Sequence, residues 1–145
     1  MRRWRISQLG VALQSHEVRG AKELDIAFAA IAKDHSDRLL LIEDQLTFEY
    51  RTQIISFTRQ ELLPSSFVGK EAVETGGLMS YGASFPEMYH HAATIVDKIL
   101  RRAKPSDLPV EQATKFEFAT NLKTANALGI EVSPKVLVRA DTVIE

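Results

Sequence analysis

The chain has 145 residues, of which 45% are hydrophobic and 26% are charged. This composition is ordinary for a folded domain and too apolar for a disordered chain. The net charge of -1 gives no overall field that would attract nucleic acid or an anionic membrane. Because there is no cysteine, disulfides and thiolate chemistry are excluded.

The N-terminus does not have the pattern of an export signal. Arg2, Arg3 and Arg5 make it basic, but no apolar run of signal-peptide length follows them. No stretch approaches the ~20 apolar residues of a membrane span. We expect residues 1–9 to form the last turns of a helix that stops at Gly10. As written, the sequence predicts a soluble chain that is not exported.

The first half alternates short apolar strands with helical patterns, which is typical of an α/β fold with a mainly parallel sheet flanked by helices. The apolar run at residues 38–44 ends in two carboxylates and indicates a buried parallel strand. Thr47 is placed to cap the second helix. The expected strands are residues 11–18, 38–44 and 65–68, and the expected helices are residues 21–35 and 48–63.

The second half begins with a short strand between glycines, from Gly76 to Gly82. Ser84-Phe-Pro-Glu87 has the sequence of a capping box with proline in the first turn, and it predicts the start of a helix to Ala103. Prolines in the following segment favour an extended connector. The remaining expected elements are a half-exposed strand at residues 116–120, a short helix capped by Asn121, and a last helix from Ser133 to near Glu145.

Three stretches of the second half are specific: GGLMSYG, then HHAATIVDKILRRAKPSDLPVEQ, then KFEFATNLKTANALGIEVSP with VLVRADTVIE. Together they resemble the substrate-binding family of ABC-type uptake systems that includes the TrpX-like proteins. The resemblance continues more loosely through EVRGAKELDIAFAAIAKDHSDRLLLIEDQ in the first half. The chain differs from the family pattern at Ala83, where proline is usual, and at His90, where arginine is common.

The resemblance implies a type I periplasmic binding protein, in which a hinge joins two α/β lobes and a solute lies in the cleft. Family members are roughly twice as long, beyond the usual size of one lobe, so residues 1–145 resemble a single truncated α/β unit. We expect residues 10–70 to belong to the second lobe, and residues 76–145 to cross the hinge and complete the first. We then expect the chain either to form a homodimer, with or without exchange of that segment, or to rearrange into one compact α/β domain. The family is periplasmic, whereas the absent signal indicates the cytoplasm.

In open parallel sheets, ligands bind beyond the carboxyl ends of the strands. Hydroxyl groups and an arginine suit an amino-acid or carboxylate solute, and a tyrosine can stack on an aromatic group. The candidate ligand-binding residues are Arg19, Asp44, Ser65, Ser66, Ser80 and Tyr81. The structural alternative is that Arg19 and Asp44 are solvated loop charges and that Tyr81 packs at the hinge.

No catalytic or metal site is indicated. Glu87 has helical spacing to His90 and His91, but no further residues supply the third and fourth ligands of a metal, so we expect a solvated helix face. Gly76-Gly77 fits no phosphate-binding pattern, and Ser80 has no assignable base. We expect no cofactor.

The sequence therefore predicts the solute-binding component of an ABC-type uptake system. It would bind a small molecule, such as an amino acid or an aromatic carboxylate, by hinge closure, and deliver it to an ABC permease. The alternative is a cytoplasmic, non-catalytic ligand-sensing or interaction domain of the same fold. A small enzyme on a flavodoxin-like sheet has the least support.

Overall fold

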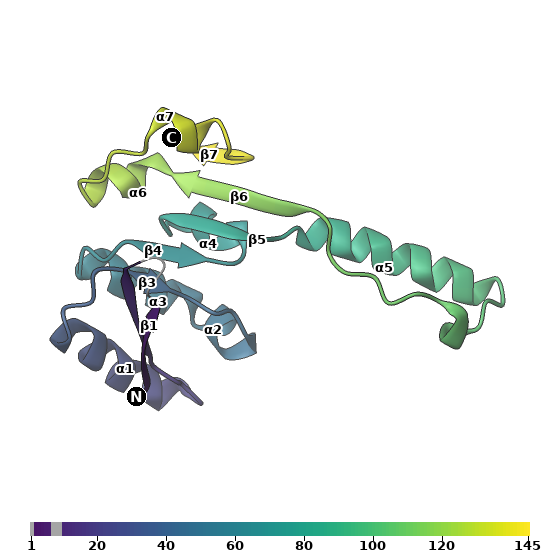
Figure 1. Cartoon of the computed structure of the whole chain (residues 1–145), viewed down its shortest axis with the longest axis horizontal. Helices are drawn as coiled ribbons and strands as arrows, with labels where there is room; N and C mark the ends of the chain where they lie inside the picture. The colour runs from purple at the N-terminus through teal and green to yellow at the C-terminus, as the bar shows by residue number, and fades with distance from the viewer. Residues whose placement is uncertain (1, 7–9) are drawn as a thin grey trace.

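The computed structural model describes residues 2–6 and 10–145, and its main sheet has five strands (Figure 1). In sheet order these are β3 (Leu39–Leu40), β4 (Ser65–Phe67), β5 (Met79–Ala83), β6 (Phe116–Asn121) and β7 (Thr142–Ile144). Neighbouring strands are parallel except for the β5–β6 pair, which is antiparallel. The predicted α/β fold with a mainly parallel sheet is confirmed.

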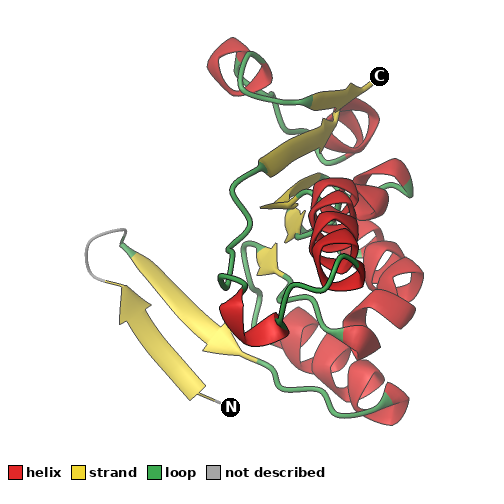
Figure 2. Ribbon diagram, turned by 90° about the vertical axis from the view of Figure 1, so that its right-hand side faces the viewer, coloured by secondary structure: helices red, strands yellow, loops and turns green. Residues whose placement is uncertain are grey.

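Seven α-helices occur in the described part of the chain, and Figure 2 shows most of them along one side of the sheet. They are α1 (Ala21–Lys33), α2 (Gln45–Glu49), α3 (Arg51–Gln60), α4 (Lys70–Glu74), α5 (Phe85–Leu100), α6 (Leu122–Ala127) and α7 (Pro134–Leu137). Within the described ranges, no helix combines the length and the apolar character that a membrane span needs.

The N-terminal residues form a hairpin instead of the end of a helix. β1 (Arg2–Ile6) pairs antiparallel with β2 (Val11–Ser15), and Gly10 adopts a φ of 61° at the turn. The helix predicted for residues 1–9 is therefore wrong at residues 2–6, while residues 7–9 lie outside the described part. So short a segment gains few intrahelical bonds, whereas pairing with β2 satisfies its backbone groups.

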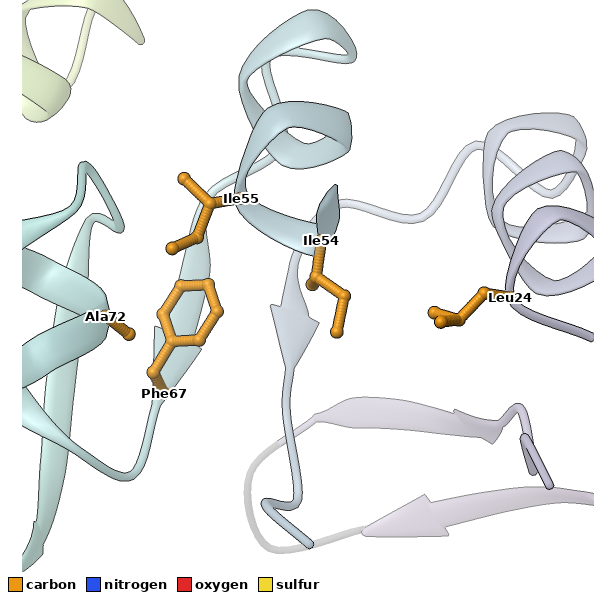
Figure 3. Packing of buried hydrophobic residues seen from close by; sticks show 5 residues of the cluster. All are labelled: Leu24, Ile54, Ile55, Phe67 and Ala72. Atoms are coloured by element: carbon orange, nitrogen blue, oxygen red, sulfur yellow. The ribbon is translucent and has the colours of Figure 1, made fainter. Parts of the chain in front are cut away.

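The core lies between the sheet and the helices on its covered side. Figure 3 shows the ring of Phe67, from β4, between Ile55 of α3 and Ala72 of α4. In the same cluster Leu24 of α1 points toward Ile54 of α3. Because apolar side chains from these four elements are buried together, α1, α3 and α4 form a helical layer that packs on the sheet at β4.

Three predictions for the region around β3 need correction. Asp44, and not Thr47, begins the helix: Thr47 N donates to Asp44 Oδ1 at 2.8 Å, and Asp44 N donates to Thr47 Oγ1 at 2.8 Å. The expected single helix is divided into α2 and α3 at Tyr50. Only Leu39–Leu40 of the apolar run form a strand, and this strand lies at the edge of the sheet with Leu40 67% exposed, so the predicted buried strand is wrong.

The C-terminus also differs from the expected helix. α7 ends at Leu137, and residues 142–144 add to the sheet as β7, parallel to β6. Two physical reasons favour the strand. Thr142-Val143-Ile144 is β-branched throughout, and Asp141 N donates to Phe118 O at 2.8 Å, which brings the segment beside β6.

α5 projects away from the sheet (Figure 1), and none of its residues is buried. We call α5 together with the returning connector, residues 101–115, the arm. His91 Nδ1 of α5 lies 2.8 Å from Glu111 Oε2 of the connector. The larger exposed apolar side chains of α5 are Phe85, Met88, Tyr89, Val96, Ile99 and Leu100. The predicted helix is confirmed, but its apolar face is uncovered.

Candidate functional site

The carboxyl ends of β3, β4 and β5 meet at one edge of the sheet, because these strands are parallel. β6 runs in the opposite direction and therefore starts at the same edge. The polar residues placed there, which we call the edge cluster, are Glu43 after β3, Gly69 and Lys70 after β4, Ser84 after β5, and Glu117 near the start of β6.

Members of the edge cluster contact one another across the strands. Gly69 N donates to Glu43 Oε2 at 3.3 Å, and Ser84 Oγ donates to Glu117 Oε1 at 2.7 Å. Lys70 Nζ lies 3.8 Å from Glu117 Oε2, with side-chain exposures of 34% and 22%. The edge thus combines two carboxylates and one ammonium group in a partly buried setting, where charge-assisted hydrogen bonds are strong.

Two glycines allow close packing in and next to β5. Gly82 lies near the carboxyl edge, and Gly77 lies before the start of the strand. A Cβ on Gly82 would lie 2.5 Å from Val68 O and 2.6 Å from Val68 Cγ1. A Cβ on Gly77 would lie 2.8 Å from Phe67 Cε2 and 2.9 Å from Ala72 O. All four distances are below ordinary van der Waals contact, so Gly77 and Gly82 of the GGLMSYG stretch are required by packing.

The two candidate site residues on β5 lie on opposite faces of the sheet. Ser80 is buried on the face of Phe67 and Ala119, and its hydroxyl has no hydrogen-bond partner among the described residues. Tyr81 is 61% exposed on the other face. Its ring stacks on Phe116 of β6, with centroids 5.7 Å apart.

The remaining candidates are scattered. Ser65 and Ser66 lie within β4, beside Leu39 and Leu40, and Ser65 opens the strand at the end away from the edge cluster. Arg19 follows the β1–β2 hairpin and pairs in solvent with Glu17 at 3.6 Å.

Asp44 directly follows Glu43 and caps α2. The backbone hydrogen bond from Thr47, assisted by the Thr47 hydroxyl, lowers the pKa of the Asp44 carboxyl below its usual value. The carboxylate therefore already has a structural role at the helix start. It stands beside the edge cluster without a contact to the cluster among the hydrogen bonds of the described residues.

Lys70, Ser84 and Glu117 are absent from the sequence-based candidates. Ser84 was assigned to a capping box, but as the residue that begins α5 it makes no side-chain capping bond, so that prediction is wrong. α4 has only five residues, too few to produce a helical period in the sequence. No pattern therefore identified Lys70 as the first residue of a helix. For Glu117 the sequence does contain one relevant pattern. The alternation of residues 116–120 places Glu117 and Ala119 on the same face of the strand.

A mainly parallel sheet with a polar carboxyl edge, in which the antiparallel neighbours β5 and β6 are joined through an arm, matches one lobe of a periplasmic-binding-protein fold. Residues 3–144 match the family model described as ABC transporter substrate binding protein. The chain belongs to this family. None of the curated protein sequences matches it.

Solved structures agree with this assignment. A conserved domain protein from Vibrio cholerae O1 biovar El Tor is 25% identical, with a TM-score of 0.86 over 94% of this chain and 46% of that one. The ABC domain from Streptococcus pneumoniae in complex with L-Trp is 23% identical, with a TM-score of 0.87 and the same coverages, 94% and 46%. A ligand-free, open substrate-binding protein from Clostridium difficile is 18% identical, with a TM-score of 0.62 over 95% and 46%. The chain thus spans about half the length of these proteins.

Proposed function

We propose that this chain is the C-terminal part of the solute-binding component of an ABC-type uptake system, and that it acts without a covalent step. The observation that carries the proposal is the edge cluster, which lies at the carboxyl edge of the sheet in a member of this family. Ligands of open parallel sheets bind at that edge. A permease of the same system would be its partner.

The chemistry of the edge favours an amino acid with an aromatic or apolar side chain. The Lys70 ammonium group suits a carboxylate, and Glu43 or Glu117 suits an ammonium group. The exposed Tyr81–Phe116 pair lies at the same end of β5 and β6, on the opposite face of the sheet from Glu117, and offers an aromatic surface there. An aromatic amino acid is also what the Streptococcus pneumoniae neighbour holds.

Closure around the solute would need a second wall, because one sheet edge contacts only one side of a ligand. We propose that residues 10–70, which contribute Glu43, Gly69 and Lys70 to the edge cluster, belong to the second lobe, that residues 76–145 carry the chain across the hinge, and that the facing wall belongs to the first lobe. Ligand contacts made to both walls only in the closed state would drive closure.

A thermal-shift screen of the 145-residue chain tests the proposal. L-tryptophan, other L-amino acids and aromatic carboxylates are added; at 100 times its dissociation constant a bound solute adds about 2.7 kcal/mol of stability. We expect the stabilising solute to lose its effect in Lys70→Met. The matched control is Lys135→Met, a lysine on α7, which should behave as the parent. If no compound shifts the melting temperature, the solute-binding role of this chain is wrong.

The second candidate is a cytoplasmic ligand-sensing or interaction domain that self-associates, and the uncovered face of α5 favours it. The chain exposes 10807 Å², whereas a compact monomer of this mass exposes about 7,500 Å². The excess is larger than the roughly 800 Å² that each partner buries in a standard interface. We propose that a second copy covers part of it, by exchange of the arm.

Sedimentation velocity at micromolar concentration should therefore give a dimer. Met88→Glu places a charge on the uncovered face of α5 and should give a monomer. Val138→Glu adds the same charge to an exposed valine outside α5 and should leave the dimer intact. A parent chain that sediments as a compact monomer would contradict self-association.

A further inference from the structure

Ser84 stands at the point where β5 passes into α5, and it is 3% exposed. Together with Glu87 it has the sequence of a capping box, yet the box is not formed. The Ser84 N–H is bonded elsewhere, and Glu117 fixes the orientation of the Ser84 hydroxyl. Ser84 Oγ donates to Glu117 Oε1 at 2.7 Å, and Ser84 N donates to Lys115 O at 3.0 Å.

Glu117 also faces the start of α4. Its Oε2 lies 3.8 Å from Lys70 Nζ, so a single carboxylate joins β6, α4 and the β5–α5 junction. The contact is partly buried, and at such sites an ion pair is screened less than on an open surface. Glu117 therefore links the start of the arm, at the β5–α5 junction, to the sheet.

The capping box and these contacts exclude each other. In a box, the serine oxygen would accept the backbone N–H of Glu87, and the Glu87 carboxylate would accept Ser84 N–H. Ser84 N–H cannot serve Glu87 and Lys115 O at once. The junction therefore has two alternative bonding patterns, one tied to the sheet and one tied to the helix.

We propose that Glu117 is a positioning residue, a latch that selects the sheet-tied pattern and so fixes the direction in which the arm leaves the sheet. Release of Glu117 lets Ser84 and Glu87 form the capping box, and the arm then moves about this junction. A packed element with two discrete arrangements is what a conformational switch requires. The inference is independent of which solute, if any, the chain binds.

Amide hydrogen exchange followed by NMR separates a latch from a merely structural residue. In Glu117→Ala, exchange at Ser84 N–H should become faster, because its bond to the backbone acceptor Lys115 O in the sheet is replaced by a bond to the side chain of Glu87 on the surface of the helix. Exchange at Glu87 N–H should become slower by about fivefold, the effect of a typical helix cap. Loss of a merely structural contact would speed exchange at both amides, and this outcome, like no change at either, would overturn the proposal.

Further variants control for folding and for the role of each group. Ser84→Thr keeps the hydroxyl and should exchange as the parent does. In Ser84→Ala combined with Glu117→Ala, the slowing should disappear, because the hydroxyl that would accept the Glu87 N–H is absent. If Glu117→Ala does not fold, Lys70→Met removes only the ion pair and should change both rates in the same directions by a smaller factor.

The position of the arm can be measured directly, because the chain has no cysteine. Spin labels on Leu100→Cys, at the end of α5, and Val138→Cys, beyond α7, report the distance between arm and sheet; both side chains are exposed. We expect a narrow distance distribution in the parent and one at least twice as broad in Glu117→Ala. Equal distributions in the two folded proteins would show that Glu117 does not position the arm.

Discussion

Gly82→Ala is expected to lower the free energy of unfolding by about 2–3 kcal/mol, the upper part of the range for overpacking. The new Cβ would lie 2.5 Å from Val68 O and 3.1 Å from Val68 C. Those atoms belong to the backbone and cannot rotate away as a flexible side chain would. The strands β4 and β5 must therefore separate where their carboxyl ends meet.

Urea unfolding gives the measurement, with comparison of midpoints at equal slope. Gly20→Ser is the matched control, because a Cβ at Gly20 meets nothing within 4 Å and serine is well accepted where a helix begins. Gly20→Ser should unfold as the parent does or at higher urea. If Gly82→Ala matches the parent within about 0.5 kcal/mol, a normal surface effect, the close approach of β5 to Val68 is wrong.

Phe67→Ala should have the largest effect, a loss of about 3–5 kcal/mol. Phe67 is 2% exposed and lies in the core cluster with Ile55 and Ala72. Truncation leaves a cavity between β4 and the helices that cover it. Ser80 lies on the same face, so the cavity would also border a hydroxyl that has no hydrogen-bond partner within residues 2–6 and 10–145.

Phe116→Ala is the matched control on the other face of the sheet. Phe116 is 49% exposed and packs mainly against Tyr81, so its loss should cost no more than about 1 kcal/mol. The same urea experiment compares the two variants. Equal costs would mean that the face of Tyr81 and Phe116 is covered in solution, against the structure described above.

The parts of the fold that were predicted correctly depend on local signals. Asn121 begins α6 as expected, because its side chain accepts the backbone N–H of Thr124 at 3.0 Å, three residues away. The apolar spacing of residues 21–35 likewise predicted α1 from its own side chains. The alternation of strands and helices was sufficient for the fold class.

The errors arise where a distant partner competes with a local preference. Ser84 has a local capping partner in Glu87, but Glu117, 33 residues further along the chain, takes its hydroxyl. Residues 142–144 follow the short helix α7, but they pair with the free edge of β6 and so join the sheet. The same contrast applies to the candidate site. Asp44 could be identified from the sequence because it ends an apolar run. Lys70 and Glu117 are distant in the sequence and come into contact only because of the order of the strands in the sheet.

The antiparallel pairing of β5 and β6 also separates what the sheet requires of the sequence from what the arm requires. The chain leaves the sheet after Ala83 and returns at Phe116, directly opposite in the ladder. For the sheet, the whole excursion between these residues is equivalent to the loop of a hairpin, since a tight turn would close the same ladder. The sheet itself therefore does not fix the length or the sequence of the arm, and the family-like pattern of residues 90–112 must reflect what the arm contacts.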